Sequence, residues 1–173
     1  MTKGDILYEK KIYIRKPTKE YSKQVFRLIK ECENLDLNSE YLYLLQNTHF
    51  KESCSIAVCE NRVVGFVSGY KLPNEPEILF IWQVAINEEF RGIGLANKLI
   101  SNTLKRKLNS GITRIHTTVS PDNKSSIKMF TKLAKNLDTK IIAKKFFKKE
   151  DFINSHEEEV LYEIGPIKQK ELK

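Results

Sequence analysis

The sequence contains no apolar run long enough to cross a membrane, and its first residues, Met1 to Asp5, lack the apolar segment of a secretory signal. We therefore expect a protein of the cytosol that has no membrane partner. It also has few cysteines: Cys32, Cys54 and Cys59 are odd in number and form no CxxC pair. This spacing predicts reduced, mostly buried thiols rather than a disulfide framework. The histidines show no metal-ligand spacing either, so no metal is implied.

The chain is too short for a second domain to be expected. Its 173 residues, 40% of them apolar, suffice for one well-packed core. No internal repeat, low-complexity linker or other domain boundary is visible. We expect a single domain over residues 1–173, with its core at about residues 10–166 and a polar tail at residues 167–173.

Acidic residues are the scarcer of the charged types. Lys and Arg number 30 against 22 Asp and Glu, which gives a formal net charge of +8. Such a charge attracts polyanions. The basic residues, however, are scattered in short groups beside apolar residues instead of forming one stripe interleaved with aromatic residues. We therefore expect no nucleic-acid partner, whereas a ligand with several phosphate groups suits a moderately positive surface.

The spacing of apolar residues predicts strands and helices in an ordered series. Period-two or continuous apolar patterns predict strands at residues 11–15, 55–59, 63–70, 78–86, 113–119, 140–143 and 160–164. Helical spacing predicts four helices: one after Pro17 with Val25, Leu28, Ile29 and Cys32 inside, a short one with Tyr41, Leu42, Leu44 and Leu45, one at residues 94–109, and one capped by Asp122 or Asn123.

Two of these elements carry more specific expectations. The strand at residues 78–86 is apolar almost throughout, which is typical of a central strand buried on both faces. The helix at residues 94–109 is expected to bury Leu95, Leu99, Leu104 and Leu108, with Gly111 marking its end.

A glycine-containing turn, Arg91-Gly92-Ile93-Gly94-Leu95-Ala96, joins the central strand to that helix. The first backbone N–H groups of a helix lack internal partners and lie at the positive end of its dipole, so they can bind a pyrophosphate. Gly92 and Gly94 permit close approach because they carry no Cβ. The pattern lacks the third glycine of a Rossmann fingerprint and the Gly-Lys-Ser/Thr of a Walker loop. Judged on the glycines alone, a tight turn without a ligand is an equal alternative.

The flanks of this turn resemble the acetyl-CoA site of the GCN5-related N-acetyltransferase (GNAT) superfamily, in which Arg/Gln-x-x-Gly-x-Gly/Ala follows a buried strand. The resemblance covers nearly the whole chain and implies an α/β (α+β) fold, with a central mixed, mostly antiparallel twisted sheet flanked by helices. It also implies that the strand backbone, the turn and a later asparagine bind acetyl-CoA. The residues at these positions are Val84, Ala85, Ile86, Arg91, Gly92, Ile93, Gly94, Leu95, Ala96 and Asn123.

Many members of the superfamily carry a tyrosine seven residues after the asparagine to protonate the departing thiolate. Phe130 stands there in this chain, so another acid or solvent must serve.

Further motifs resemble one family within that superfamily, the L-2,4-diaminobutyrate acetyltransferases of ectoine synthesis. They include Leu35-Asp36-Leu37-Asn38-Ser39-x-Tyr41-x-Tyr43, Trp82-Gln83-Val84-Ala85, Thr118-Val119-x-Pro121-Asp122-Asn123 and His156-Glu157-x-Glu159-x-Leu161-Tyr162. This resemblance implies acetyl transfer from acetyl-CoA to the 4-amino group of L-2,4-diaminobutyrate, and a homodimer. Another small-molecule or polyamine N-acetyltransferase of the same fold is the alternative. A CoA-binding or nucleic-acid-binding module without turnover is a more distant one.

The matched motifs contain the candidate substrate ligands. The ammonium groups of a diamino acid need carboxylates or carbonyls at close range. The candidates are Asp36, Tyr41, Trp82, Thr118, Glu157 and Glu159. If residues 156–164 form a strand, Glu157 and Glu159 share a face with Leu161, and a solvated sheet edge is the other explanation for these carboxylates. Trp82 either walls the substrate pocket or packs in the core.

The chemistry also requires a base. An alkyl amine with a pKa of about 10 is almost fully protonated at neutral pH, whereas the attacking nitrogen must be neutral. We expect Glu159 to remove the proton, directly or through water, with His156 as the alternative base. His156 can equally be a structural hydrogen-bonding residue. Trp82 completes the candidate catalytic set, because it precedes the strand segment that the resemblance places beside the thioester.

Overall fold

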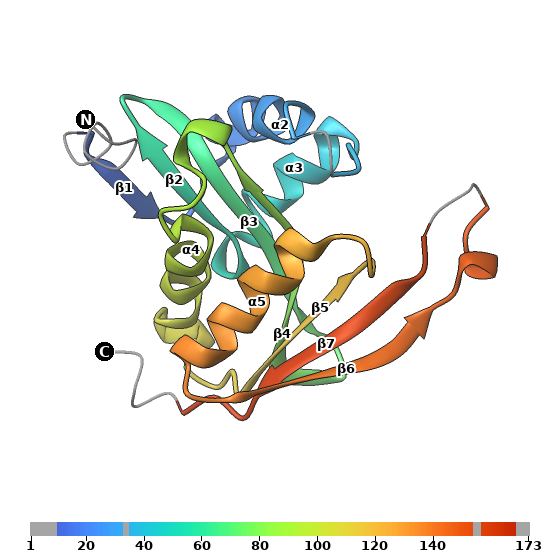
Figure 1. The fold of residues 1–173 in the computed structure, drawn as a ribbon. Helices are drawn as coiled ribbons and strands as arrows, with labels where there is room; N and C mark the ends of the chain where they lie inside the picture. The colour runs from blue at the N-terminus through green and yellow to red at the C-terminus, as the bar shows by residue number, and fades with distance from the viewer. Residues whose placement is uncertain (1–9, 33–34, 154–156, 169–173) are drawn as a thin grey trace. The chain divides into compact units, whose positions relative to one another are not determined.

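The computed structural model describes residues 10–32, 35–153 and 157–168 (Figure 1). Its strands are β1 (Ile12–Arg15), β2 (Ser55–Cys59), β3 (Arg62–Leu72), β4 (Glu75–Ile86), β5 (Arg114–Val119), β6 (Lys140–Phe147) and β7 (Glu159–Gly165). They form one sheet of seven strands in the order β1-β2-β3-β4-β5-β7-β6. The β4–β5 pair is parallel, and the β1–β2, β2–β3, β5–β7 and β6–β7 pairs are antiparallel. The predicted α/β class, with a mixed and mostly antiparallel sheet, is confirmed.

The α-helices of the described chain are α2 (Ser22–Lys30), α3 (Glu40–Gln46), α4 (Leu95–Leu104) and α5 (Lys124–Asn136). Short 3₁₀ turns are η1 (Lys19–Tyr21), η2 (Lys51–Ser53), η3 (Glu88–Phe90), η4 (Lys107–Asn109) and η5 (Lys149–Asp151). No helix in the described ranges is both long and apolar enough to span a membrane. The chain divides into two compact units that share strands β3 and β4: residues 1–70 with 83–110, and residues 71–82 with 111–173.

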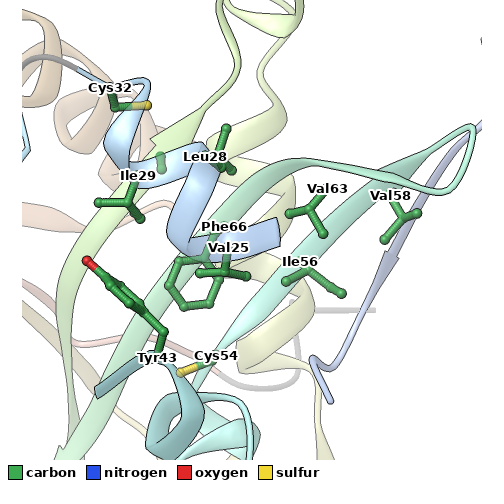
Figure 2. Close-up of a cluster of buried hydrophobic side chains, with 11 residues drawn as sticks. Val25, Leu28, Ile29, Cys32, Tyr43, Cys54, Ile56, Val58, Val63 and Phe66 are labelled. Carbon is green, nitrogen blue, oxygen red and sulfur yellow. The ribbon is translucent and has the colours of Figure 1, made fainter. Parts of the chain in front are cut away.

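The first unit has its core between α2 and the β2–β3 hairpin (Figure 2). Val25, Leu28 and Ile29 recur at helical spacing and are buried, as the sequence predicted. They pack with Ile56 and Phe66 of the hairpin strands. Burying a side chain of this size stabilises the fold by about 1.5–3 kcal/mol, so this cluster is a main source of the unit's stability.

The β2–β3 hairpin follows from its turn. Cys59 pairs with Arg62, which leaves Glu60 and Asn61 as a two-residue loop. Both have positive φ, 50° and 62°, the conformation of the type I′ turn that matches the twist of paired strands. Asn61 adopts it readily, whereas Glu60 is held in it by the pairing on either side.

The second unit contains β5, β6, β7, α5 and the first part of β4. Asn123 caps α5: its Oδ1 accepts a hydrogen bond of 3.0 Å from the Ser126 N–H. The buried side of α5 consists of Phe130, Leu133 and Ala134. The strands of this unit, and the helix that the sequence predicted after residue 123, lie where they were expected, except that β6 continues beyond the predicted residues 140–143 to Phe147.

The expectation that β4 is buried on both faces is wrong. Leu79, Ile81 and Gln83 are buried, but Trp82 between them is 45% exposed. β4 therefore alternates in burial over this stretch, as a strand with one more open face does. The apolar run of the sequence concealed this because Trp82 and Phe80 are aromatic residues on the more open side.

The predicted end of the helix at residues 94–109 is also wrong. α4 ends at Leu104, Leu108 is 64% exposed, and Gly111 does not mark the end. Beyond the end of the helix, Arg106 is bound to another segment: its Nη1 lies 2.9, 2.8 and 2.6 Å from the carbonyl oxygens of residues 51, 52 and 54. Asn109 then donates 2.8 Å hydrogen bonds to the carbonyls of Thr103 and residue 52.

The predicted short helix is present as α3, and its buried side chains are not the residues whose spacing indicated it. Tyr43 and Gln46 are buried, whereas Tyr41 is 68% exposed and Leu44 is exposed as well. Ser39 caps the helix by accepting a hydrogen bond from the Leu42 N–H at 3.3 Å. The buried residues are thus a phenol and an amide, which an apolar pattern does not identify.

The three cysteines are free and buried, as predicted. The Cys54 thiol donates towards the Gly69 carbonyl at 3.8 Å. Burial raises the pKa of Cys54 to about 12. This thiol is therefore protonated and unreactive at physiological pH.

Candidate functional site

The glycine turn has the conformation that a phosphate-binding loop needs. After η3, Gly92 and Gly94 have φ of 88° and 76°, so both lie in the left-handed region that favours glycine. Nothing lies within 4 Å of the point where a Cβ of either residue would stand. Backbone conformation, rather than crowding within the protein, therefore requires glycine at both positions. The space beside them is open to a ligand.

The start of α4 fits an anionic ligand. Its N-cap is Gly94, and no side chain caps the helix. The first N–H groups of α4 are therefore left to a ligand or solvent, at the positive end of the helix dipole. Arg91 is exposed beside them, and its Nε donates a 3.1 Å hydrogen bond to the Ile86 carbonyl. A pyrophosphate, such as that of CoA, matches this combination of N–H groups and positive charge.

The strand segment before the turn is the end of β4. Val84 and Ile86 are half-buried and Ala85 is buried, so the segment alternates in burial. The Asn87 N–H donates to the Val64 carbonyl at 2.9 Å, and the Ile86 carbonyl is engaged by Arg91. Three strand residues were predicted to contact the cofactor. The Ile86 carbonyl is bonded to the Arg91 side chain, whereas the carbonyls of Val84 and Ala85 are not.

Asn123 and Phe130 belong to the second unit. The Asn123 oxygen is used by the α5 cap, which leaves the side-chain NH₂ as the group suited to a cofactor arm. Phe130 is buried on the inner side of α5. Because the phenyl ring has no acidic proton, Phe130 contributes to packing in this place.

The predicted substrate residues of the first unit lie on and near α3. Asp36 is exposed in the loop before the helix, and Tyr41 is exposed in its first turn. The Asp36 carbonyl accepts a 2.7 Å hydrogen bond from Gln83 Nε2. The carboxylate is thereby attached to a loop whose backbone is bonded to β4.

Three predicted residues of the second unit share one face of its sheet. Phe80 of β4 is the register partner of His116, so the two-residue strand period places Trp82 and Thr118, each two residues further on, on one face. Thr118 pairs with Leu161 of β7, and Glu159 lies two residues from Leu161 on the same face. By strand alternation, an indole, a hydroxyl and a carboxylate therefore lie on the same face of three strands.

Glu157 does not join them. β7 begins at Glu159, so the prediction that Glu157 and Glu159 share a strand face with Leu161 holds only for Glu159. Glu157 is exposed before the strand and forms a 2.8 Å ion pair with Lys149. His156, the alternative base, lies outside the described residues.

One titratable residue on this face received no role from the sequence. His116 is flanked by Glu163, whose Oε1 lies 3.7 Å from its Nε2, and Lys144 lies 2.7 Å from the other oxygen of Glu163. Burial lowers the pKa of His116, although Glu163 opposes this shift. The ring is therefore neutral at pH 7. Only strand register, which pairs His116 with Glu163, could have identified this cluster.

The sequence matches the model of the acetyltransferase (GNAT) family over residues 22–134, which includes the glycine turn, the end of β4 and Asn123. The chain belongs to this family and is therefore an acetyltransferase.

Its relatives narrow the group further. The chain is 47% identical over 158 residues to the L-2,4-diaminobutyric acid acetyltransferase of Methylotuvimicrobium alcaliphilum, covering 91% of this chain and 92% of that protein. It is 43% identical over 154 residues to the enzyme of the same name from Virgibacillus pantothenticus, covering 88% and 97%. The resemblance to diaminobutyrate acetyltransferases that the sequence motifs indicated is confirmed.

A solved structure is similar as well. Diaminobutyrate acetyltransferase EctA from Paenibacillus lautus, in complex with its substrate L-2,4-diaminobutyric acid and coenzyme A, has a TM-score of 0.87 and 34% identity to this chain. The similarity covers 91% of this chain and 96% of that protein.

Proposed function

We propose that the chain transfers an acetyl group from acetyl-CoA to the 4-amino group of L-2,4-diaminobutyrate, giving N4-acetyl-L-2,4-diaminobutyrate and CoA. The reaction is a step of ectoine synthesis, and we propose that it takes place in the cytosol. The single observation that supports this most strongly is the 47% identity, over nearly the full length of both chains, to a diaminobutyric acid acetyltransferase. Identity at that level extends beyond the cofactor turn, which all acetyl-CoA enzymes of this fold need.

The residues that would hold acetyl-CoA are those of the turn, the strand end and the α5 cap. The N–H groups from Gly92 to Ala96 bind the pyrophosphate, and Arg91 adds positive charge. The backbone of Val84 and Ala85 aligns the pantetheine arm, and the Asn123 amide donates to it. When bound, acetyl-CoA supplies an acetyl group already activated as a thioester.

Carboxylates and an aromatic wall would hold the diamino acid. Asp36 and Glu159 offer charge-assisted hydrogen bonds to ammonium groups, and Glu157 can do so only by giving up its ion pair with Lys149. Trp82 lies on the same sheet face as Thr118 and Glu159, where a half-exposed indole can cover the aliphatic part of the substrate. The Tyr41 and Thr118 hydroxyls can bond the substrate carboxylate or amine.

Glu159 is the proposed base. It starts β7 and is half-buried, so it has access both to solvent and to the face that carries Trp82 and Thr118. Removing one proton from the 4-ammonium group leaves a lone pair for attack on the acetyl carbon. His156 is the alternative base. Phe130 cannot protonate the departing thiolate, and solvent is the simplest donor to that group.

We also propose a homodimer. The sheet ends in the edge strands β1 and β6, and exposed edges favour pairing or coverage. β6 carries the exposed apolar residues Ile142, Phe146 and Phe147, which a second subunit would cover. Light scattering at increasing protein concentration tests this, and a monomer at all protein concentrations would contradict it.

A substrate panel tests the proposed function. The release of CoA thiol is followed with acetyl-CoA and L-2,4-diaminobutyrate, 1,4-diaminobutane, spermidine or a peptide N-terminus. The proposal predicts the highest kcat/KM for diaminobutyrate. Faster turnover of spermidine or a peptide would assign the chain to another acceptor within the same family.

A further inference from the structure

Gln83 and Tyr43 belong to the motifs that mark this family resemblance, yet the proposed function assigns neither a role. Gln83 lies in β4 directly before the strand end that faces the acyl donor, and Tyr43 lies in α3. Their side chains are 4% and 0% exposed, so neither is available to a ligand at the surface. Tyr43 is one of the cluster of buried residues drawn in Figure 2. Two polar groups buried this deeply need partners within the protein.

Those partners belong to the loop that carries Asp36. Gln83 Nε2 donates a 2.7 Å hydrogen bond to the Asp36 carbonyl. The Tyr43 hydroxyl donates to Gln83 Oε1 at 3.4 Å and accepts from the Asn38 N–H at 3.2 Å. The loop is therefore held at both sides of Leu37 by one pair of buried side chains.

The chemistry of these groups allows only one arrangement. A carbonyl oxygen can only accept, so the amide nitrogen of Gln83 must face Asp36. The amide oxygen then faces Tyr43, whose single proton goes to that oxygen and whose lone pair accepts from Asn38. The backbone of Gln83 is fixed in turn, because its N–H donates to the Ser68 hydroxyl at 3.1 Å.

We infer that Gln83 and Tyr43 are positioning residues, which hold the Asp36 loop at a set place relative to the β4 backbone so that its carboxylate meets an ammonium group of the acceptor. The inference rests on the proposed function, because that function makes Asp36 a substrate ligand. One strand then serves both substrates: its backbone at Val84 and Ala85 aligns the acyl donor, and its side chain at Gln83 sets the loop that binds the amine. Loss of the Gln83 and Tyr43 side chains should weaken the binding of diaminobutyrate and leave the binding of acetyl-CoA unchanged.

The test compares two side-chain deletions with a matched control. Gln83→Met keeps the length of the side chain and removes both of its hydrogen bonds, and Tyr43→Phe removes one buried hydroxyl. Thr103→Val is the control, because it also removes one buried hydroxyl, which lies 2.7 Å from Ser55 Oγ, far in sequence from the loop. Melting temperature is measured for all three variants, so that a general loss of stability is separated from an effect on the loop.

Gln83→Met is expected to raise KM for diaminobutyrate by roughly three- to tenfold, the range for one or two lost hydrogen bonds, with KM for acetyl-CoA within about twofold of wild type. Tyr43→Phe should show a smaller rise in the same direction, and Thr103→Val should show none. Equal rises in both KM values, or an unchanged KM for diaminobutyrate in Gln83→Met, would overturn the inference.

Gln83→Glu adds a readout that a purely structural role would not produce. The ionised carboxylate places an oxygen against the Asp36 carbonyl, and a protonated carboxyl can donate again. The ratio of KM for diaminobutyrate between this variant and wild type should therefore fall as pH decreases. A ratio independent of pH would count against the arrangement.

Amide exchange separates failure of this inference from failure of the proposed function. The Asn38 N–H should exchange faster in Tyr43→Phe than in wild type, because the hydroxyl to which it donates is removed. This expectation does not depend on which amine the enzyme acetylates. If wild type does not use diaminobutyrate, the proposed function fails and this measurement alone decides the positioning role. Unchanged exchange at Asn38 would overturn that role.

Discussion

The Nε of Arg91 donates a 3.1 Å hydrogen bond to the carbonyl of Ile86, so the first residue of the glycine turn is tied to the last residue of β4. This bond closes the turn from the side chain, and the positive φ of Gly92 and Gly94 shapes it from the backbone. Together they direct the start of α4 at open space. The arrangement suits a pyrophosphate and is independent of the acceptor amine.

Replacing Gly94 should therefore weaken the binding of CoA without changing the binding of diaminobutyrate. Gly94→Val places a β-branched residue at a φ of 76°, which costs about 1–2 kcal/mol or more and forces the turn to rearrange. CoA affinity measured by calorimetry should fall by about tenfold, with diaminobutyrate affinity little changed. Gly111→Val is the matched control, since a Cβ there also meets open space and the residue has no positive φ. Comparable losses for both ligands in Gly94→Val would show that the two sites are not divided in this way.

Glu159→Gln should remove the base while keeping the shape of the side chain. A positioned base contributes about 10²–10⁴-fold to rate, so kcat should fall by about 100-fold or more. The rise of rate with pH that reflects ionisation of the base should disappear from the profile. Glu150→Gln, an exposed glutamate paired with Lys148, is the control and should behave as wild type. Unchanged kcat and pH profile in Glu159→Gln would exclude this base.

His116 should make stability depend on pH. Its pKa is lowered from 6.5, chiefly by burial, so the unfolded state binds more protons below about pH 6.5. The free energy of unfolding should therefore be highest above that pH and should fall as the solution is acidified through the folded-state pKa. Urea denaturation at pH 7.5, 6 and 5 measures this. The fall should be smaller in His116→Gln, and an equal fall in both proteins would assign it to other groups.

The cysteine thiols should not react with a thiol reagent in the native protein. Cys32, Cys54 and Cys59 are buried, and the pKa of Cys54 is about 12. A chromogenic disulfide at pH 8 should therefore not react with native protein, but should titrate 3 thiols in denaturant. Rapid reaction of a native thiol would contradict the burial. The same result makes thiol release a clean assay for CoA.

Local signals predicted the parts of the fold whose causes are local. The glycine turn between β4 and α4 could be predicted because the positive φ of Gly92 and Gly94 demands glycine. The end of α4 was not predictable, because Arg106 binds carbonyls about fifty residues earlier in the chain. Nor was the buried side of α3, because the partners of Tyr43 are distant in sequence: its ring packs in the core of the first unit and its hydroxyl meets Gln83, forty residues on.

The same distinction applies to the site. The turn that suits the acyl donor is continuous in sequence, so six residues, Arg91 to Ala96, were enough to predict a pyrophosphate-binding turn. The shared face of Trp82, Thr118 and Glu159 depends on the pairing of three strands, and His116 received no role from the sequence for the same reason. Glu157 was misplaced because the shared face assumed a strand over residues 156–164, whereas β7 begins at Glu159.

The most direct test of the central claim is the identity of the acetylated nitrogen. Purified protein is incubated with acetyl-CoA and L-2,4-diaminobutyrate, and the product is analysed by NMR and mass spectrometry. A single product with the acetyl group on the 4-amino nitrogen is the predicted result. Acetylation at the 2-amino nitrogen, or no acetylated diaminobutyrate under conditions in which another amine is turned over, would contradict it.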